Sequence, residues 1–181
     1  MEKQNVSTWK ANLNWGLILG FVLVIYTAIL YFADQTFNKG LGSVSYLFMI
    51  AGIFFGIKAY RDNFLGGFIS YGKAVGAGVI ISLYSGILGA IFTILLYTAI
   101  DPDLVQKLYS ITEQGMLDKG MAEEQIEVAM EVSKKFMSPY FMAVWVIVGS
   151  VFVGLIISLI EAIFLKKEGD PVVSEAEKTE E

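Results

Sequence analysis

Cysteine and histidine are absent from the 181 residues of the sequence. Their absence excludes disulfides, Cys₂His₂-type zinc sites, a cysteine nucleophile, a histidine-based catalytic triad and a histidine haem ligand. It leaves the redox compartment open. The sequence also has no P-loop, no Gly-x-Ser-x-Gly or His-Glu-x-x-His motif and no pair of catalytic carboxylates. We therefore expect a protein that is not an enzyme and that has no cofactor.

Basic charge is also scarce. The formal net charge is −5, and no stripe of lysine and arginine with interleaved aromatic residues occurs, so we expect no nucleic-acid partner. By contrast, 55% of the residues are hydrophobic, 17% are charged, and the mean hydropathy is strongly positive. This composition is typical of membrane proteins and predicts contact with the lipid bilayer. We expect a single membrane domain over residues 1–167.

The longest stretch without a charged side chain lies between Lys73 and Asp101. A bilayer core of about 30 Å is crossed by roughly 20 apolar residues in a helix. The stretch is longer than that, and it predicts a transmembrane helix over 72–100. Three further apolar runs predict spans over about 13–33, 43–59 and 139–165. The predicted fold class is therefore an all-α membrane protein, a four-transmembrane-helix bundle.

Two of these spans have competing interpretations. The first could be a secretory signal peptide, but its apolar run exceeds the roughly 7–15 residues of such a peptide, and no A-x-A-like cleavage site follows it. The second span is short. It can cross a bilayer by including loop residues, by snorkelling of Lys58, or where the bilayer is locally thin. A re-entrant helix is the alternative for this segment.

Residues 101–138 are polar but carry apolar residues at helical spacing. They predict an amphipathic helical hairpin between the third and fourth spans, on the non-cytoplasmic side. The residues expected to fold this hairpin onto the bundle are Leu104, Leu108, Ile126 and Met130. A mobile acidic loop is the alternative, and a ligand groove is the less favoured explanation of the apolar stripe.

Asp101, Pro102 and Asp103 have the residue types that start a helix, with an acid at the N-cap and proline after it. Asp101-x-Asp103 also has the form of the Asp-x-Asp metal motif of nucleotide-sugar transferases. Capping explains the pair, and its predicted side of the membrane is away from nucleotide-sugars, so we expect no metal site. The acidic segment 168–181 holds few apolar residues and is predicted to be a disordered tail.

Small residues recur along one face of the third span and of the fourth. They are Gly78, Ser82, Gly86 and Gly89 in the third span and Ser150, Gly154 and Ser158 in the fourth. In lipid there is little hydrophobic force between helices, and small residues mark the places where two backbones approach closely. We therefore predict that these two spans cross along the two stripes. Together with several Gly-x-x-x-Gly pairs, the stripes favour a tight bundle over a role in dimerisation alone.

Glu161 is the only acidic residue inside a predicted span. A carboxylate within a membrane is costly, so a proton or ion pathway is one hypothesis for it. However, Glu161 lies about one turn before Lys166 and Lys167, near the boundary of the span. The favoured interpretation is a structural ion pair with Lys73 or, as second choice, with Lys58.

The positive charges that flank the spans predict the orientation. One side of the membrane would carry Lys3, Lys10, Lys58, Arg61, Lys73, Lys166 and Lys167. On the other side, acidic residues outnumber the lysines of 101–138, although acids count little in this rule. We predict that both termini lie in the cytoplasm.

The segment YRDNFLGGFISYGKAVGAGVIISLYSGILGAIF, which begins at Tyr60, resembles domain-of-unknown-function family 4199, found mainly in Bacteroidota. The similarities are Tyr60-Arg61-Asp62, Gly66-Gly67 and the run 69–74 that leads into a glycine-rich span. The later segment GMAEEQIEVAM is similar to the family's loop. The resemblance covers roughly residues 10–166. It implies a four-span inner-membrane protein and supplies no catalytic residues.

The expected function is that of a non-enzymatic multi-pass protein of the bacterial inner membrane, a scaffold or accessory subunit of a cell-envelope complex. The resemblance suggests the envelope, because family members tend to occur with genes for envelope sugar transfer. Expected partners are an envelope protein or a second copy of the chain. The alternative is a small transporter or flippase component that uses Glu161. Transport predicts several polar side chains at mid-membrane, where the spans offer mainly serine and threonine.

Overall fold

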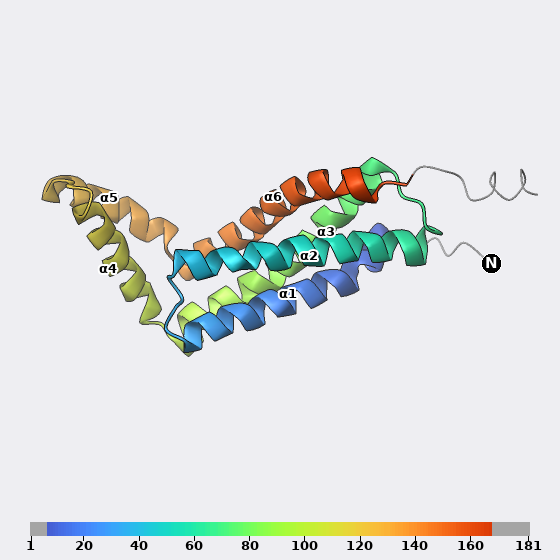
Figure 1. Cartoon of the computed structure of the whole chain (residues 1–181). Coiled ribbons are helices and arrows are strands. Elements are labelled where there is room, and N and C mark those ends of the chain that lie inside the picture. Colours follow the sequence, from blue (N-terminus) through green and yellow to red (C-terminus); the bar gives the residue numbers. More distant parts are fainter. Residues whose placement is uncertain (1–6, 168–181) are drawn as a thin grey trace, which may run out of the picture.

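The computed structural model describes residues 7–167, which are mostly helical (Figure 1). In chain order, the helices are α1 (Thr8–Phe32), α2 (Lys39–Phe64), α3 (Tyr71–Leu95), the π-helical segment η1 (Leu96–Ile100), α4 (Leu104–Leu117), α5 (Glu123–Phe136) and α6 (Pro139–Leu165). Apart from one isolated β-bridge, the described residues contain no β structure. The predicted tail 168–181 lies outside the described residues.

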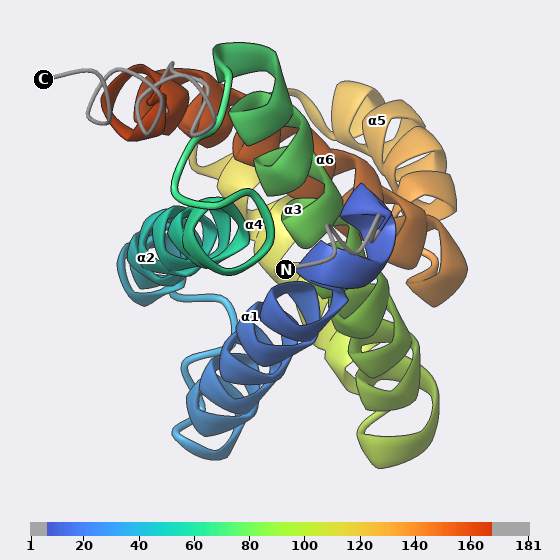
Figure 2. The same cartoon turned by 90° about the vertical axis from the view of Figure 1, so that its right-hand side faces the viewer.

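Four helical segments are long and apolar enough to cross a membrane. They are α1, α2, α6 and the continuous segment Tyr71–Ile100, which α3 and η1 form together. These segments assemble into a bundle (Figures 1 and 2). The predicted fold class, an all-α protein with four candidate membrane-spanning helices, is confirmed.

Helix α2 is longer than the predicted second span and begins at a well-defined cap. The side-chain Oδ1 of Asn38 accepts hydrogen bonds from the backbone nitrogens of Gly40 and Leu41, at 3.0 and 3.2 Å. Such a cap satisfies N–H groups that have no partner within the helix. The 26 residues of α2 rise about 39 Å at about 1.5 Å per residue. A thin bilayer or a re-entrant path is therefore not required.

Helix α3 is the central element of the bundle and lies between α6 and α1 (Figure 2). Its contact with α6 is the most extensive between any two described helices, and its contact with α1 is the next. Glycines of α1 permit the second contact: a Cβ added at Gly16 would lie 2.5 Å from Tyr84 Cβ, and one at Gly20 would lie 2.6 Å from Leu88 Cδ1. A larger residue at either position would force α1 away from α3.

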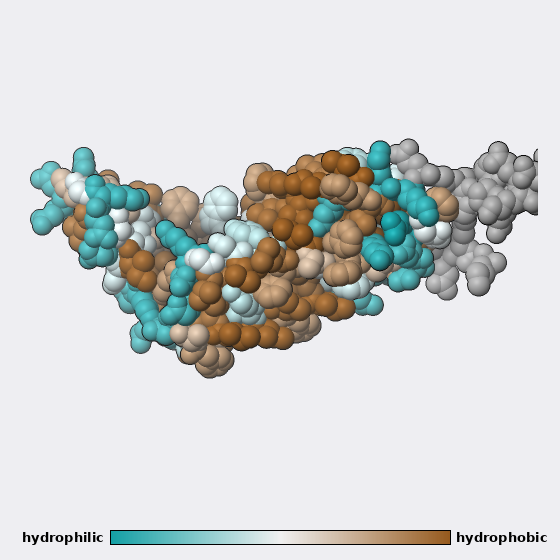
Figure 3. Space-filling model, in the orientation of Figure 1, coloured by the Kyte–Doolittle hydropathy of each residue, from teal (hydrophilic) through white to brown (hydrophobic). Residues whose placement is uncertain are grey.

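The outer surface of the bundle is apolar, whereas hydrophilic residues gather at its two ends (Figure 3). Large apolar side chains that point outward include Phe21, Ile25, Phe32, Phe152 and Phe164. A water-soluble bundle would bury such residues, but a lipid-facing surface requires them. The surface is therefore compatible with a membrane protein.

At the end of the bundle where α1 begins and α6 ends, the loop between α2 and α3 is hydrogen-bonded to the C-terminal end of α6. Ile69 and Lys167 exchange two backbone hydrogen bonds of 3.0 Å, and Arg61 Nη1 donates to the carbonyl of Leu165 at 3.3 Å. The loop turns at Gly66 and Gly67, whose φ angles of 65° and 88° favour glycine. The Arg61 and Gly66-Gly67 positions of the family resemblance therefore have structural roles here.

Helices α4 and α5 project from the opposite end of the bundle (Figure 1). They pack on each other more extensively than on the long helices. Two polar contacts hold the base of α4: an exposed one, in which Lys107 Nζ lies 2.6 Å from Asp34 Oδ1, and a part-buried one, in which Tyr31 donates to Asp101 Oδ2 at 3.2 Å. The two helices are here called the α4–α5 unit.

Candidate functional site

The structure brings the two predicted small-residue stripes together. A Cβ added at Gly78 would collide with Ser158, one at Gly154 would collide with Ser82, and one at Gly86 would lie 2.9 Å from Ser150 Cβ. Each small residue therefore makes room for the backbone of the facing helix. At Gly89 the corresponding neighbour is Val146 Cγ1, at 3.1 Å.

The serines of this interface satisfy their own hydroxyl groups. Ser82 and Ser158 donate to the carbonyls of Gly78 and Gly154 in their own helices, at 2.8 and 2.5 Å. Ser150 instead donates across the interface, to the carbonyl of Ser82 at 2.7 Å. Because no hydroxyl here is left without a partner, the α3–α6 interface is suited to holding the bundle together rather than to binding a ligand.

Glu161 lies in α6, one turn beyond Ser158, and only 7% of its surface is exposed. Neither carboxylate oxygen has a hydrogen-bond partner among residues 7–167. The expected ion pair with Lys73 or Lys58 is therefore not formed. Both lysines lie on exposed faces of their helices, whereas the packed faces carry residues such as Ile57 and Ala74. The order of the spans in the sequence predicted that these lysines lie near the same end of the bundle as Glu161. It did not predict which face of each helix carries them.

A second buried polar group, which the sequence-based predictions missed, is Asn12 of α1. Its Nδ2 donates to the carbonyl of Thr8 at 2.8 Å, while its Oδ1 is buried and has no hydrogen-bond partner in the part of the chain that the structure describes. The sequence signal for this group is a polar amide directly before the first apolar run. The prediction assigned that segment to the polar flank of the span. Asn12 and Glu161 are the described residues with buried, unpartnered side-chain oxygens.

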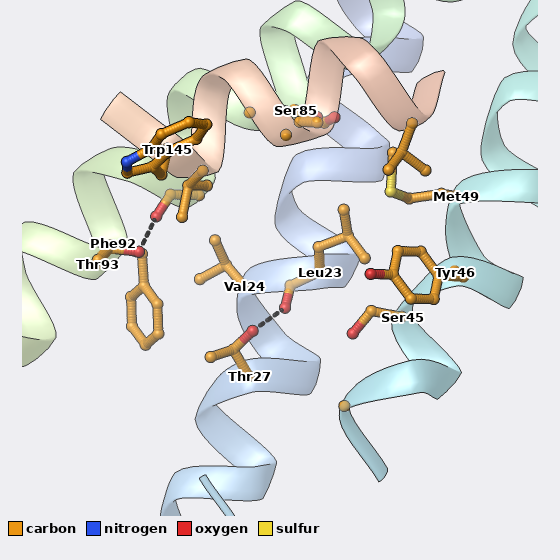
Figure 4. A pocket seen from close by; sticks show the side chains of 17 residues that line it. Leu23, Val24, Thr27, Ser45, Tyr46, Met49, Ser85, Phe92, Thr93 and Trp145 are labelled. Atoms are coloured by element: carbon orange, nitrogen blue, oxygen red, sulfur yellow. Dashed lines mark hydrogen bonds between the residues drawn. The ribbon is translucent and has the colours of Figure 1, made fainter. Parts of the chain in front are cut away.

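A cavity of about 410 Å³ lies in the half of the bundle nearer the α4–α5 unit. Its wall is formed by side chains from α1, α2, α3 and α6 (Figure 4). The small-residue stripes did not predict this cavity, because a gap between four helices depends on how the helices are rotated and tilted. No charged residue lines the cavity.

Three of the four residues expected to dock the α4–α5 unit are buried. Leu104, Ile126 and Met130 are buried, whereas Leu108 is only half-buried. Helix α5 contacts α4 more than it contacts α6. The turn at 101–103 directs α4 away from the bundle (Figure 1), so the two helices bury their apolar faces against each other.

An apolar stripe on α5 stays exposed. Val128, Val132 and Phe136 follow one another at four-residue spacing, and 66%, 50% and 50% of their surfaces are exposed. Residues at this spacing share one face of a helix. The stripe is flanked in sequence by Glu127 and Glu131.

The expected side-chain cap at the start of α4 is absent. Asp103 occupies the N-cap position without a side-chain hydrogen bond to the helix, and Asp101 accepts from Tyr31. Asp101 therefore joins α4 to α1 instead of capping α4. Within residues 7–167, no group of three or more acidic residues is placed to hold a metal ion.

Comparison with known families decides the classification. The family model described as "Protein of unknown function (DUF4199)" matches residues 14–167. The chain belongs to the DUF4199 family. No curated protein matches the chain, and no solved structure matches it.

The DUF4199 match extends over the bundle and the α4–α5 unit together. The α3–α6 interface, Glu161, the cavity and the stripe on α5 therefore all lie within the matched residues, whereas Asn12 lies just before them. Within the described part of this DUF4199 protein, four structural features could serve a function. They are the α3–α6 interface, the buried Glu161, the cavity and the exposed stripe on α5.

Proposed function

We propose that this DUF4199 protein is a non-enzymatic, multi-pass protein of the bacterial inner membrane that acts as a scaffold or accessory subunit of a cell-envelope complex. In this proposal both termini are cytoplasmic and the α4–α5 unit lies on the non-cytoplasmic side. The distribution of lysine and arginine supports this orientation. The four long apolar helices supply the membrane anchor.

The observation that carries the proposal is the exposed stripe Val128, Val132 and Phe136 on a unit that projects from the bundle. A helix that lies outside the lipid gains nothing from an exposed row of large apolar residues unless something covers them. Amphipathic helices are commonly recognised through anchors at this spacing, which lie in a groove of the partner.

The charges beside the stripe indicate the chemistry of the partner. Acidic residues outnumber lysines over 101–138, and Glu127 and Glu131 lie next to the stripe in sequence. We therefore propose an envelope protein with an apolar groove that is edged by lysine or arginine. Charge complementarity of this kind speeds encounter and suppresses wrong partners.

Site-specific photocrosslinking in the native cells tests the proposal. A photoreactive amino acid at Val128 should yield a defined adduct with one envelope protein, and the same amino acid at Gln106, an exposed position on α4, should not. Val132→Asp should abolish the Val128 adduct, because it places a charge within the apolar contact. Ser110→Asp adds the same charge elsewhere on the unit and should leave the adduct unchanged.

Two results would contradict the scaffold proposal. One is an adduct at Val128 that survives Val132→Asp. The other is labelling of Val128 by lipid alone, which would mean that the stripe contacts the membrane surface. An adduct between two copies of the chain would identify a second copy, and not an envelope protein, as the partner of the stripe.

A second candidate function is a small transporter or flippase component, which the buried carboxylate of Glu161 favours. Neither of its oxygens has a partner among the described residues, and ionisable groups inside membrane helices often belong to transport paths. Glu161→Gln in proteoliposomes should then preserve folding and abolish a pH-dependent flux. Lys73→Met is the control, and equal flux in wild type and Glu161→Gln would exclude this function.

A further inference from the structure

The cavity between the four long helices is partly open and large enough to hold a ligand. Protein interiors are packed as densely as organic crystals and contain few voids larger than a water molecule. This cavity holds about 410 Å³, within the roughly 300–1,000 Å³ that small-molecule ligands occupy. A space of this size costs the bundle many van der Waals contacts unless a ligand fills it.

The wall of the cavity offers few free hydrogen-bonding groups. Thr27 donates to the carbonyl of Leu23 at 2.8 Å, Thr93 donates to that of Gly89 at 2.9 Å, and Ser85 donates to that of Ser82 at 2.9 Å. The other wall residues are largely apolar, and none is charged. A hydrated ion would find no ligands here, whereas hydrocarbon would find favourable contacts.

The cavity opens between α2 and α6, toward the surface that faces lipid. Tyr46 of α2 and Trp145 of α6 both line it, yet 52% and 56% of their surfaces are exposed. These two residues therefore form the edge of the cavity. Behind them, Met49 and Ser85 belong to the wall and are buried.

Along α2, two polar side chains of the wall lie between Met49 and the start of the helix at Lys39. The hydroxyl of Tyr46 points into the cavity (Figure 4), and Ser45 lies beside it in the wall. Neither hydroxyl donates a hydrogen bond within residues 7–167 in the way that Thr27 and Thr93 do. Lys39 begins the same helix, about 9 Å before Ser45 along the helix axis at about 1.5 Å per residue.

We propose that this cavity binds one acyl chain of a membrane phospholipid, which enters sideways between α2 and α6. The chain contacts the apolar wall, and its ester carbonyl accepts a hydrogen bond from Tyr46 or Ser45. The phosphate of the lipid then lies toward Lys39. This order of apolar wall, hydroxyl groups and cation matches the order of chain, ester and phosphate in a phospholipid.

Two glycines in the wall allow the cavity to be filled without disturbing the bundle. A Cβ added at Gly149 of α6 or at Gly42 of α2 meets no atom within 4 Å. Gly149→Leu and Gly42→Leu therefore place a side chain where the structure is open. Gly76→Leu of α3 is the matched control, because Gly76 is equally open but does not line the cavity.

The test uses vesicles that contain a phospholipid with a photoactivatable diazirine in one acyl chain. After illumination, mass spectrometry should find label on Met49 and Ser85, which bulk lipid does not reach because both are buried. Gly149→Leu and Gly42→Leu should each reduce this label roughly tenfold or more, a change of about 1.4 kcal/mol in binding free energy. Gly76→Leu should leave it unchanged.

Parallel vesicles that carry a diazirine-labelled isoprenyl phosphate distinguish the source of the chain. Preferential labelling of Met49 and Ser85 by that probe would overturn the phospholipid assignment. The proposal also fails if Met49 and Ser85 stay unlabelled while the outward-facing Phe152 is labelled. It fails likewise if folded Gly149→Leu and Gly42→Leu are labelled like wild type. The scaffold function does not depend on any of these outcomes.

Discussion

At the scale of single residues, the closest approach of α3 and α6 depends on glycines, which have no side chain to separate the two helices. Gly154 faces Ser82 and Gly78 faces Ser158 so closely that even a methyl group would collide. The interface therefore tolerates much less change than the lipid-facing surface, where large apolar residues are interchangeable.

Gly154→Leu and Gly86→Leu are each expected to destabilise the folded protein by about 1–3 kcal/mol or more, because the added bulk separates two backbones. Thermal unfolding in detergent measures the effect. Leu83→Ile keeps the volume, and Gly76→Leu makes the same change at an open position, so both controls should unfold near the wild-type temperature. Wild-type stability of both interface variants would show that the stripe is not the helix contact.

Glu161 gives the second prediction at this scale. Because its carboxylate has no hydrogen-bond partner among the described residues, Glu161→Gln breaks no hydrogen bond there and replaces a buried acid by a neutral group of the same shape. We expect stability to be unchanged or to rise, by about 1 kcal/mol. In a double-mutant cycle with Lys73→Met, the two effects should add. A coupling energy of about 1 kcal/mol or more would show that Glu161 and Lys73 do interact, which would contradict this prediction.

At the scale of elements, the α4–α5 unit is a small pair of helices that projects from the bundle (Figure 1). Leu104, Ile126 and Met130 are buried in it, and its links to the bundle include exposed contacts such as Lys107 with Asp34. Exposed ion pairs contribute little to stability. The unit should therefore open far more often than the bundle.

Hydrogen exchange measures this difference. Backbone amides of 104–112 should exchange more slowly than in an unfolded chain but faster than those of α3, since local opening depends on local packing. Met130→Ala should speed exchange in both α4 and α5 and leave α3 unchanged. Val128→Ala, at an exposed position, is the control. Complete exchange of 104–112 within seconds in wild type would mean that the unit has no stable packing.

At the scale of the whole molecule, the first described helix begins and the last one ends at the same end of the bundle, as an even number of crossings requires (Figure 1). Reporter fusions after Lys167 and within 113–124 should therefore report opposite sides of the membrane. The flanking charges predict a cytoplasmic signal after Lys167 and none within 113–124. A cytoplasmic signal from 113–124 would show that the orientation is the reverse of the predicted one and that the α4–α5 unit lies in the cytoplasm.

The long apolar helices of the described residues, and the small residues that line two of them, follow from the sequence alone. Uncharged runs of membrane length and small residues every four positions are local patterns, and each helix carries its own pattern completely. Helix ends were less well determined: the cap at Asn38 begins α2 earlier than its apolar run suggests.

The tertiary structure alone decided three other features. The oxygens of Glu161 have no hydrogen-bond partner within residues 7–167, although Lys58 and Lys73 lie near the same end of the bundle. A cavity separates the helices beside Tyr46, and the α4–α5 unit projects instead of folding back (Figure 1). Each of these features depends on how one helix is rotated and tilted against another. The periodicity of a single helix shows which of its faces is apolar or small, but it does not specify which residue of a neighbouring helix that face will meet.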